Sequence, residues 1–320
     1  MQTIPPLSNI ASSLYQFQRT AQWVAPASNP AYSESHQNLL KRFPLLNKIY
    51  HHGFRIGFEL LTAGAIRKDG WQRKMVTKAC RKNLEQVTDL ALREKLTPDY
   101  QPMCKRLIMS SEYYQAIQKP NVELVTDKIV RIEPKGVVTE AGRLIELDVI
   151  ALATGFYPGV DKQLPQMEGV NGMTIQQAWQ DSVDAYRSLA VPQFPNFFML
   201  LGPNCPVGNF SVISVAETQV DYILQFINQH IKGTFKAMSP KQDVTDQLNA
   251  EMKAAARNTI WTTGCNSWYL DKNGDPISWP WSGRQYRKHL KELRLDEYVD
   301  ESSEPNATQP TPSEEPATAH

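Results

Sequence analysis

The sequence predicts an α/β protein, and two segments of the chain carry that prediction. Asp148–Gly155 is a continuous apolar run that ends in Thr-Gly, which is typical of a strand buried on both faces of a sheet. Phe197–Gly202 repeats the pattern, and beyond a Gly/Pro/Asn loop the apolar residues from Val215 to Ile231 keep helical spacing. A strand followed by a loop and a helix is the repeating unit of α/β sheets, whose ligands bind just beyond the carboxyl ends of the strands.

The elements nearer the N-terminus fit the same class. Leu14–Gln18 roughly alternates apolar and polar residues, so it predicts a half-buried strand that ends at Arg19. Residues 34–95 have apolar side chains at spacings of three and four, which predicts a helical segment that Pro44 divides. Basic residues are dense there, and the run indicates a solvated helix face rather than an anion site; its members are Lys68, Arg73, Lys74, Lys78, Arg81 and Lys82.

The ends and the middle of the chain complete the secondary structure. Residues 122–144 hold short apolar segments separated by turn residues, so we expect short strands there. Met1–Ile10 is expected to make a poor helix, because Pro5 and Pro6 interrupt it. The C-terminal residues from Val299 on are rich in Pro and Glu and contain no Phe, Tyr or Trp, which predicts a disordered tail over 299–320.

Charge and hydropathy exclude several classes of protein. The chain has 34 Lys and Arg against 33 Asp and Glu, a net charge of +1, and this balance gives no basic footprint for nucleic acid. The longest apolar runs are far shorter than the roughly 18 residues of a membrane span. The first basic residue is Arg19, and two early prolines break any apolar leader core, so we expect a cytoplasmic protein.

Cysteine, histidine and glycine spacings exclude several kinds of site. Cys80, Cys104, Cys205 and Cys265 show no C-x-x-C or zinc-finger spacing, so we expect ordinary thiols. The six histidines have no partners at metal-ligand spacing, which argues against a metal site. No G-x-S-x-G is present, and no two glycines are separated by one residue, so the phosphate-binding G-x-G-x-x-G is absent from this sequence.

The loop Gly202–Ser211 supports two interpretations. Its Gly and Pro residues suit a simple connection between a strand and a helix. Its small residues and the following helix N-terminus also suit the close approach of an anionic cofactor. Cys205 within it is a buried small thiol rather than a nucleophile, since no partner base is identifiable.

Several motifs, in order, resemble the second half of flavin-dependent Baeyer-Villiger monooxygenases. The resemblance covers roughly residues 1–295, and it rests on the ordered combination rather than on any one motif. Its segments are Phe17–Val24, Cys104–Ile108 with Tyr113–Tyr114, Pro120–Val125, Gly136–Thr139, Asp148–Phe156, Gly202–Ser211 and Gly264–Tyr269.

The resemblance implies an enzyme that uses FAD and NADPH. In that family NADPH reduces FAD, the reduced flavin reacts with oxygen, and a peroxyflavin inserts one oxygen atom into a ketone or oxidises a heteroatom. The expected partners are therefore a small ketone or thioether-like substrate and oxygen, with no nucleic acid and no membrane span.

The same resemblance implies roles for individual residues. Arg19 and Lys105 would recognise the NADPH 2′-phosphate, for which a guanidinium fork and a point charge are both suited. Arg106 would be the catalytic arginine, whose permanent charge stabilises negative charge at the flavin. Trp268 is either a pocket residue or ordinary packing. The remaining residues that the resemblance assigns to cofactor binding are Thr20, Thr154, Gly155, Asn209, Ser211 and Val212.

The implied fold is an incomplete pair of Rossmann-like dinucleotide-binding domains with a helical insert. A partial NADPH-binding domain is expected over 1–27 and 99–159, the insert over 28–98, and an FAD-side domain over 160–298. Family members begin with two glycine motifs and F-x-G-x-x-x-H-x-x-x-W between them, none of which this sequence contains. The alternative is therefore a non-catalytic remnant or interaction module, active only with a partner chain that supplies the missing half.

Overall fold

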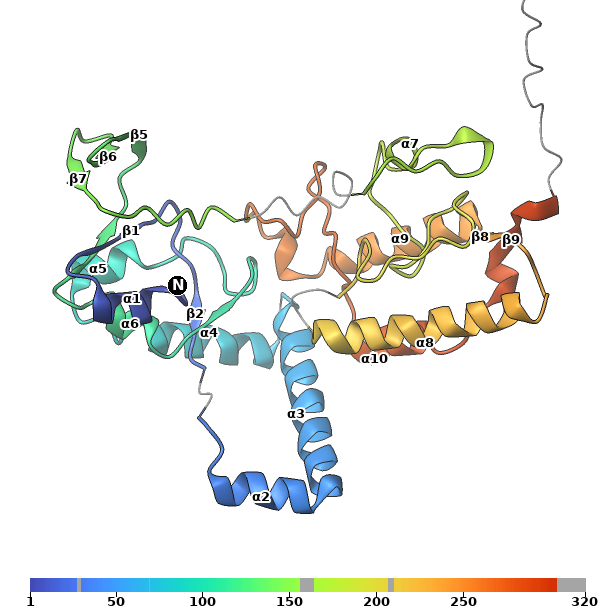
Figure 1. Ribbon diagram of the computed structural model, residues 1–320, viewed down its shortest axis with the longest axis horizontal. Coiled ribbons are helices and arrows are strands. Elements are labelled where there is room, and N and C mark those ends of the chain that lie inside the picture. Colours follow the sequence, from blue (N-terminus) through green and yellow to red (C-terminus); the bar gives the residue numbers. More distant parts are fainter. Residues whose placement is uncertain (28–29, 69, 156–163, 207–209, 304–320) are drawn as a thin grey trace, which may run out of the picture. The chain divides into compact units, whose positions relative to one another are not determined.

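The computed structural model describes residues 1–27, 30–68, 70–155, 164–206 and 210–303. The chain divides into two compact units, which are described separately (Figure 1). Unit 1 consists of Met1–Pro158 and Ala255–Pro276, and unit 2 of Gly159–Ala254 and Ile277–His320. Both units combine helices and strands, which confirms the predicted α/β class.

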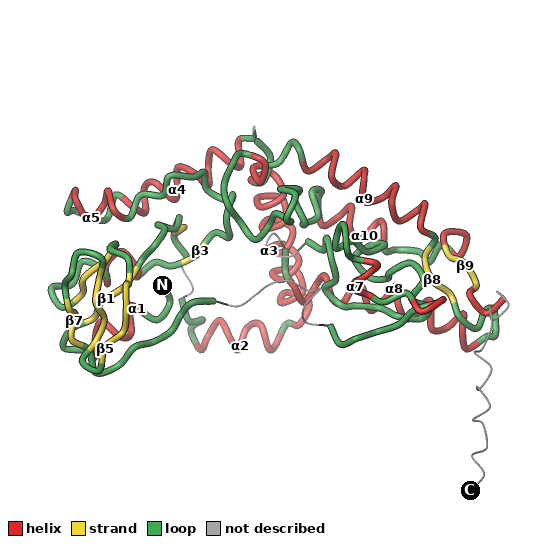
Figure 2. The backbone as a smooth tube through the Cα atoms, turned by 90° about the horizontal axis from the view of Figure 1, so that it is seen from above, coloured by secondary structure: helices red, strands yellow, loops and turns green. Residues whose placement is uncertain are grey.

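Unit 1 contains two pairs of parallel strands, of which β1 and β3 are labelled in Figure 2. β1 (Leu14–Phe17) pairs with β4 (Val122–Val125), and β2 (Val24–Ala25) pairs with β3 (Ile108–Met109). Helices α1 (Ile4–Ile10) and α6 (Tyr113–Ala116) pack against each other beside these strands. Their core is apolar and holds the buried residues Trp23, Val24, Leu84, Tyr113, Ile117 and Leu124.

A three-stranded antiparallel meander follows β4 in unit 1. It consists of β5 (Ile129–Glu133), β6 (Gly136–Thr139) and β7 (Leu144–Glu146), as the turn residues of this segment predict. Gly136 has φ +156°, and a Cβ there would lie 1.9 Å from the Ile145 carbonyl oxygen, so only glycine fits this close approach.

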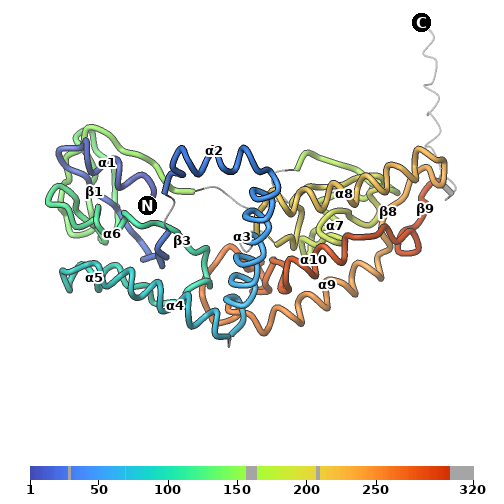
Figure 3. Tube along the Cα trace, turned by 90° about the horizontal axis from the view of Figure 1, so that it is seen from below, coloured from blue at the N-terminus to red at the C-terminus, as the bar shows by residue number. Residues whose placement is uncertain are grey.

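The helical segment of unit 1 is divided where the sequence predicts. α2 (Glu34–Arg42) ends just before Pro44, which begins α3 (Pro44–Ala65), and the two helices meet at a corner (Figure 3). Proline suits the first turn of a helix because the N–H groups there have no partner within the helix. α4 (Trp71–Leu84) and α5 (Leu90–Lys95) follow, and the buried Asn83 amide of α4 donates to the Val24 carbonyl at 3.0 Å.

Unit 2 is mainly helical. Its elements are α7 (Ile175–Ala178), α8 (Val212–Ile231), α9 (Gln242–Ala256, whose last two residues belong to unit 1), α10 (Gly283–His289) and an antiparallel pair of β8 (Met238–Pro240) with β9 (Tyr298–Asp300). Capping boxes begin α7 at Thr174 and α10 at Ser282. α8 confirms the helix predicted from apolar spacing. Short 3₁₀ turns of unit 2 lie at Val170–Gly172, Leu295–Glu297 and Glu301–Ser303, and one of unit 1 lies at Ile260–Thr262.

Three expectations about secondary structure are wrong. The described part of Asp148–Gly155 and the run Phe197–Leu201 form no strand. Neither run pairs with a strand in the described part of the chain. Its backbone N–H and C=O groups therefore have no neighbouring strand with which to form hydrogen bonds. Met1–Ile10 does contain a regular helix, because Pro5 and Pro6 fall in its first turn, where proline is tolerated.

The domain boundaries expected from the sequence stay a prediction. The tail expected over 299–320 lies mostly outside the described residues, of which β9 and the turn Glu301–Ser303 are the last. Among the described helices, none combines the length and apolarity that a membrane crossing requires. The described residues also bring no three His, Cys, Asp or Glu side chains together as metal ligands.

Candidate cofactor-binding and active site

The segments that precede β2 and β3 are held together in unit 1. The Trp23 indole donates to the Tyr100 carbonyl at 2.6 Å, and the Tyr100 hydroxyl lies 2.8 Å from Gln22 Oε1. The backbone N–H of Ile108 donates to the Trp23 carbonyl at 3.3 Å. Because β2 and β3 are parallel, the residues before them enter the pair from the same end. The structure therefore brings together the two segments that carry the predicted NADPH-binding cations.

The predicted phosphate-binding cations lie on these two segments. Arg19 is exposed and Thr20 is half-buried in the bend after β1, while Lys105 is half-buried before β3. The Lys105 ammonium lies 4.6 Å from the centre of the Tyr100 ring, a cation–π contact that orients the lysine. Within the described residues, neither Arg19 nor Lys105 has a carboxylate within ion-pair distance. Both charges are therefore available to an anionic ligand.

The predicted catalytic Arg106 lies near the C-terminal aromatic segment of unit 1. Burial raises the pKa of the Tyr269 hydroxyl, and the positive charge of nearby Arg106 acts against that rise. The Tyr269 ring also contacts Trp268, with ring centroids 4.1 Å apart. Arg106 is exposed, and Trp268 is 39% exposed. Tyr269 thus connects the predicted arginine with the predicted pocket residue, a role that the sequence analysis missed.

Two of the four cysteines are not ordinary thiols. Cys104 and Cys265 form a disulfide across a sequence separation of 161 residues, with their Cα atoms 6.3 Å apart. This Cα distance lies within the usual range for disulfides. The sequence analysis missed the pair because residues so distant in sequence meet only through the fold. Each cysteine does lie within four residues of a predicted site residue, Arg106 or Trp268, and this was the available signal.

The remaining residues that the resemblance assigns to cofactor binding lie in both units. Thr154 and Gly155 are exposed in unit 1, and Gly155 has a positive φ of 88°. In unit 2, Ser211 is the N-cap of α8 and accepts a hydrogen bond from the Ser214 N–H, while Val212 is the first residue of that helix. Asn209 lies outside the described residues. The roles of these residues stay predictions.

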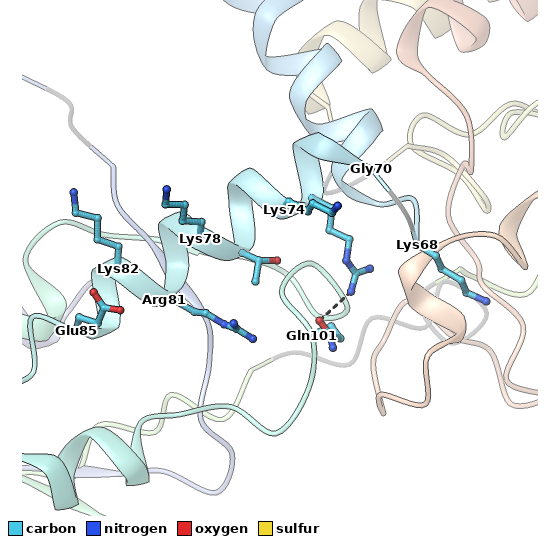
Figure 4. Close-up of a pocket in the computed structure, with 10 residues that line it drawn as sticks. Lys68, Gly70, Lys74, Lys78, Arg81, Lys82, Glu85 and Gln101 are labelled. Atoms are coloured by element: carbon cyan, nitrogen blue, oxygen red, sulfur yellow. Dashed lines mark hydrogen bonds between the residues drawn. The ribbon is translucent and has the colours of Figure 1, made fainter.

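A basic surface surrounds α4, and we call it the α4 basic surface. It borders a cavity of about 590 Å³. Lys78 and Lys82 leave one side of the helix and Arg81 leaves the other, and Arg73 donates to Gln101 Oε1 at 3.0 Å (Figure 4). Lys74, Lys78 and Lys82 follow each other at spacings of four residues. At this spacing each pair of like charges destabilises the helix by about 0.2–0.5 kcal/mol. Cations that diverge from both sides of a helix indicate a solvated face, because they do not converge on one ligand. The cations of the surface are Lys68, Arg73, Lys74, Lys78, Arg81 and Lys82.

Comparisons with known proteins find that the chain is similar to monooxygenases. It is 45% identical over 298 residues to an uncharacterized monooxygenase of Mycobacterium tuberculosis, covering 93% of this chain and 60% of that protein. It is 32% identical to a Baeyer-Villiger monooxygenase of Streptomyces coelicolor, covering 93% of this chain and 58% of that protein. The chain thus spans about three fifths of the length of these relatives. No family model matches it.

A solved structure gives the same relationship at the level of the fold. The chain resembles a mutant cyclohexanone monooxygenase from Rhodococcus sp. Phi1 bound to NADP⁺, with a TM-score of 0.78 and 24% identity, covering 93% of this chain and 64% of that one. This likeness confirms the predicted fold class, an incomplete pair of Rossmann-like domains. Together with the sequence relatives, it shows that the chain is similar to Baeyer-Villiger monooxygenases over 93% of its own length.

Proposed function

We propose that the chain is part of an FAD- and NADPH-dependent monooxygenase that inserts one oxygen atom into a ketone or oxidises a thioether-like substrate. The observation that carries the proposal is the convergence of the Arg19–Thr20 and Lys105–Arg106 segments at one end of the β2–β3 pair. When bound, the two cofactors supply hydride transfer and oxygen activation. The chain's own residues bind and orient them.

Arg19 and Lys105 fit the 2′-phosphate of NADPH. The Arg19 guanidinium can donate two parallel hydrogen bonds to a phosphate, and the Lys105 ammonium adds a compact charge. The contact between Lys105 and Tyr100 fixes the lysine beside the strand pair. NADH lacks this phosphate, so these two residues would set the preference for NADPH.

Arg106 fits the stabilisation of negative charge that develops at the reacting centre. Its guanidinium supplies a fixed positive charge with several N–H donors. Trp268, partly exposed beside Tyr269, offers an apolar ring face to a substrate. In this proposal Arg106 acts on charge, and Trp268 shapes the pocket.

The residues present fit FAD only in part. The N-terminus of α8, with Ser211 as its cap, and the exposed Thr154–Gly155 can approach a flavin. The G-x-G-x-x-G turn that binds a pyrophosphate does not occur in this sequence. The chain therefore offers contacts to the flavin without the usual anchor for its phosphates.

A second candidate function is that of a component active only with another polypeptide. Val149 and Leu152 are 79% and 77% exposed, and Ile150 is 40% exposed. This apolar run has the pattern of a strand buried on both faces, yet no strand pairs with it in the described part of the chain. Exposed apolar residues of this kind favour coverage by further polypeptide. A chain that carries the family's glycine motifs would suit the site.

Titration with NADP⁺ and NAD⁺ tests the phosphate site. We expect Arg19→Ala and Lys105→Ala each to weaken NADP⁺ binding by about tenfold or more, because each removes a charge-assisted hydrogen bond, and to leave NAD⁺ binding unchanged. Lys135→Ala, which removes an exposed cation from the β5–β6 turn, is the matched control and should change neither. Equal losses for both nucleotides would remove Arg19 and Lys105 from the 2′-phosphate site.

Flavin binding and turnover distinguish the two candidate functions and test the role of Arg106. The purified chain is mixed with FAD, alone and with a polypeptide that carries the relatives' glycine motifs, and the spectrum and NADPH oxidation are recorded. Bound flavin with product formation by the chain alone supports the first candidate, and activity only in the mixture supports the second. Arg106→Ala should abolish oxygenation and leave flavin bound; normal product formation by that variant would contradict the arginine's role.

A further inference from the structure

The disulfide joins two segments that carry different predicted functions. Cys104 immediately precedes Lys105 and Arg106, and Cys265 lies three residues before Trp268. Both cysteines are buried, with exposed fractions of 0% and 8%. Cys80 and Cys205 take no part in a disulfide, so the pairing is confined to this position.

The pocket around the two sulfur atoms suits the reduced pair as well. Cys104 Sγ lies 3.3 Å from the Ile260 carbonyl oxygen and 3.5 Å from Thr263 Oγ1, and Cys265 Sγ lies 3.3 Å from the Cys104 carbonyl oxygen. After reduction the two sulfurs must separate, and these oxygens are the hydrogen-bond acceptors nearest to the resulting thiols. Apolar neighbours, including Ile66 and Trp261, enclose the pair. The site thus offers hydrogen-bond acceptors to both thiols after reduction, while the covalent bond between the two segments exists only in the oxidised state.

The backbone beside each cysteine shows why the bond matters. Met103 has φ +72° and Gly264 has φ +91°, so the residue before each cysteine is left-handed. A methionine in that region costs about 1 kcal/mol or more and persists only where the surroundings hold it. A covalent link at the next residue is one such restraint. The bond therefore fixes the start of the Lys105–Arg106 segment against the aromatic segment.

From this arrangement we infer that Cys104 and Cys265 form a reversible oxidation site that takes a peroxide as its oxidant and a dithiol as its reductant. In the forward direction, the thiolate of one cysteine attacks an oxygen of hydrogen peroxide, giving a sulfenic acid and, after proton transfer, water. The thiol of the other cysteine then displaces the sulfenic oxygen, which leaves as a second water. Two thiols and one peroxide thus give one disulfide and two waters, and two electrons pass from sulfur to oxygen.

The reverse reaction is thiol–disulfide exchange. One thiolate of the dithiol attacks a sulfur of the bond, and its second thiol resolves the mixed disulfide. The oxidised state holds Lys105 and Arg106 in the arrangement described above, and reduction releases that restraint. The effect on cofactor binding rests on the proposed function, whereas the oxidation chemistry does not.

Thiol mapping tests the oxidation site on the wild-type chain. The chain is treated with hydrogen peroxide or with dithiothreitol, the remaining thiols are alkylated under denaturing conditions, and peptides are identified by mass spectrometry. We expect a Cys104–Cys265 cross-linked peptide after peroxide, and alkylation of both cysteines after dithiothreitol. Alkylation of both cysteines after peroxide would overturn the proposal, as would a cross-link that persists after dithiothreitol.

Hydrogen exchange tests the consequence without any cofactor. Peptides that contain residues 103–108 should exchange at least about tenfold more slowly in the oxidised chain than in the reduced one. The variant Cys104→Ala/Cys265→Ala should exchange at the reduced rate in either reagent, whereas Cys80→Ala should retain the difference. Identical exchange in oxidised and reduced wild-type chain would overturn the coupling between the bond and the Lys105–Arg106 segment.

A parallel titration with NADP⁺ separates this proposal from the proposed function. If the oxidised chain binds NADP⁺ more tightly than the reduced chain, both stand. If neither state binds NADP⁺, the 2′-phosphate site fails, while the mapping and exchange results still decide the oxidation site.

Discussion

The two units use arginine in opposite ways. Arg106 of unit 1 is exposed near Tyr269, and no carboxylate lies within ion-pair distance of it in the described residues. Arg187 of unit 2 has a side chain only 9% exposed, paired with Glu297 at 2.7 Å. A cation that must meet a ligand has to reach solvent, whereas a buried cation has to be paired. The comparison thus distinguishes a candidate site residue from a structural one of the same type.

Whereas the core cluster described for unit 1 is apolar, Arg187 is satisfied by a polar network. It also donates to the His289 carbonyl, and its guanidinium lies 5.0 Å and 5.4 Å from the ring centres of Tyr186 and Tyr222. The Tyr186 hydroxyl donates to Glu297. Burial raises the pKa of Tyr186, so this hydroxyl stays protonated and remains a donor. The stability of unit 2 therefore depends on a buried polar centre in which each side chain satisfies the charge or hydrogen bond of another.

The largest effect that we predict comes from breaking this centre. Arg187→Met leaves Glu297 partly buried without its cation, and such changes cost about 3–5 kcal/mol of stability. Peptide-resolved hydrogen exchange in increasing denaturant reads each unit separately, and the loss should appear in unit 2.

The matched change in unit 1 sharpens the comparison. Arg106→Met removes an exposed arginine and should alter the stability of unit 1 by no more than about 0.5 kcal/mol. A loss in unit 2 below about 1 kcal/mol for Arg187→Met would show that its network is dispensable. A large loss for Arg106→Met would make that residue structural and weaken its proposed role.

Periodicity and turn residues predicted most of the regular structure, because they depend on local geometry. The apolar spacing of α3 and α8, the proline that begins α3 and the turns of the meander are all local features. The apolar runs at 148–155 and 197–202 misled, because a run of apolar residues predicts a strand only where other strands lie beside it. The presence of neighbouring strands depends on the whole fold, and it cannot be deduced from the residues of the run.

The site was predictable only by resemblance. Arg19, Lys105 and Arg106 were assigned by motif, and composition alone would have left them as surface cations. The proximity of Arg106 to Tyr269 and the Cys104–Cys265 bond arise from tertiary packing across long sequence separations. Arg187 carried no local signal of burial, since its partner Glu297 lies more than a hundred residues away.

Mild acid should affect unit 2 through His289. Burial, followed by the charge of Arg187, lowers the pKa of this histidine in the folded chain. Its folded pKa lies below the unfolded value near 6.5, so the unfolded chain binds more protons and stability falls as the pH drops below about 6.5. The imidazole is half-exposed, so solvent screening should keep the loss under about 1 kcal/mol. Denaturation of wild type and His289→Gln at pH 7.5 and 5.5 should show a smaller pH effect in the variant; equal effects would exclude His289 as the source.

The smallest effect concerns an exposed ion pair of unit 1. Arg143 donates to both carboxylate oxygens of Glu123, and this hydrogen bonding lowers the pKa of that carboxyl. The stabilisation is present above the unfolded pKa near 4.3 and is lost as the pH falls through the lower folded pKa. Both side chains are nearly half-exposed, so Arg143→Met should cost less than about 1 kcal/mol at pH 7, and less still in high salt. Hydrogen exchange of the β4 and β7 peptides measures the loss of stability in Arg143→Met. Lys128→Met, which breaks the more exposed Lys128–Glu140 pair, is the control variant. A cost equal to that of Arg187→Met would mean that exposure does not separate the ion pairs of the two units.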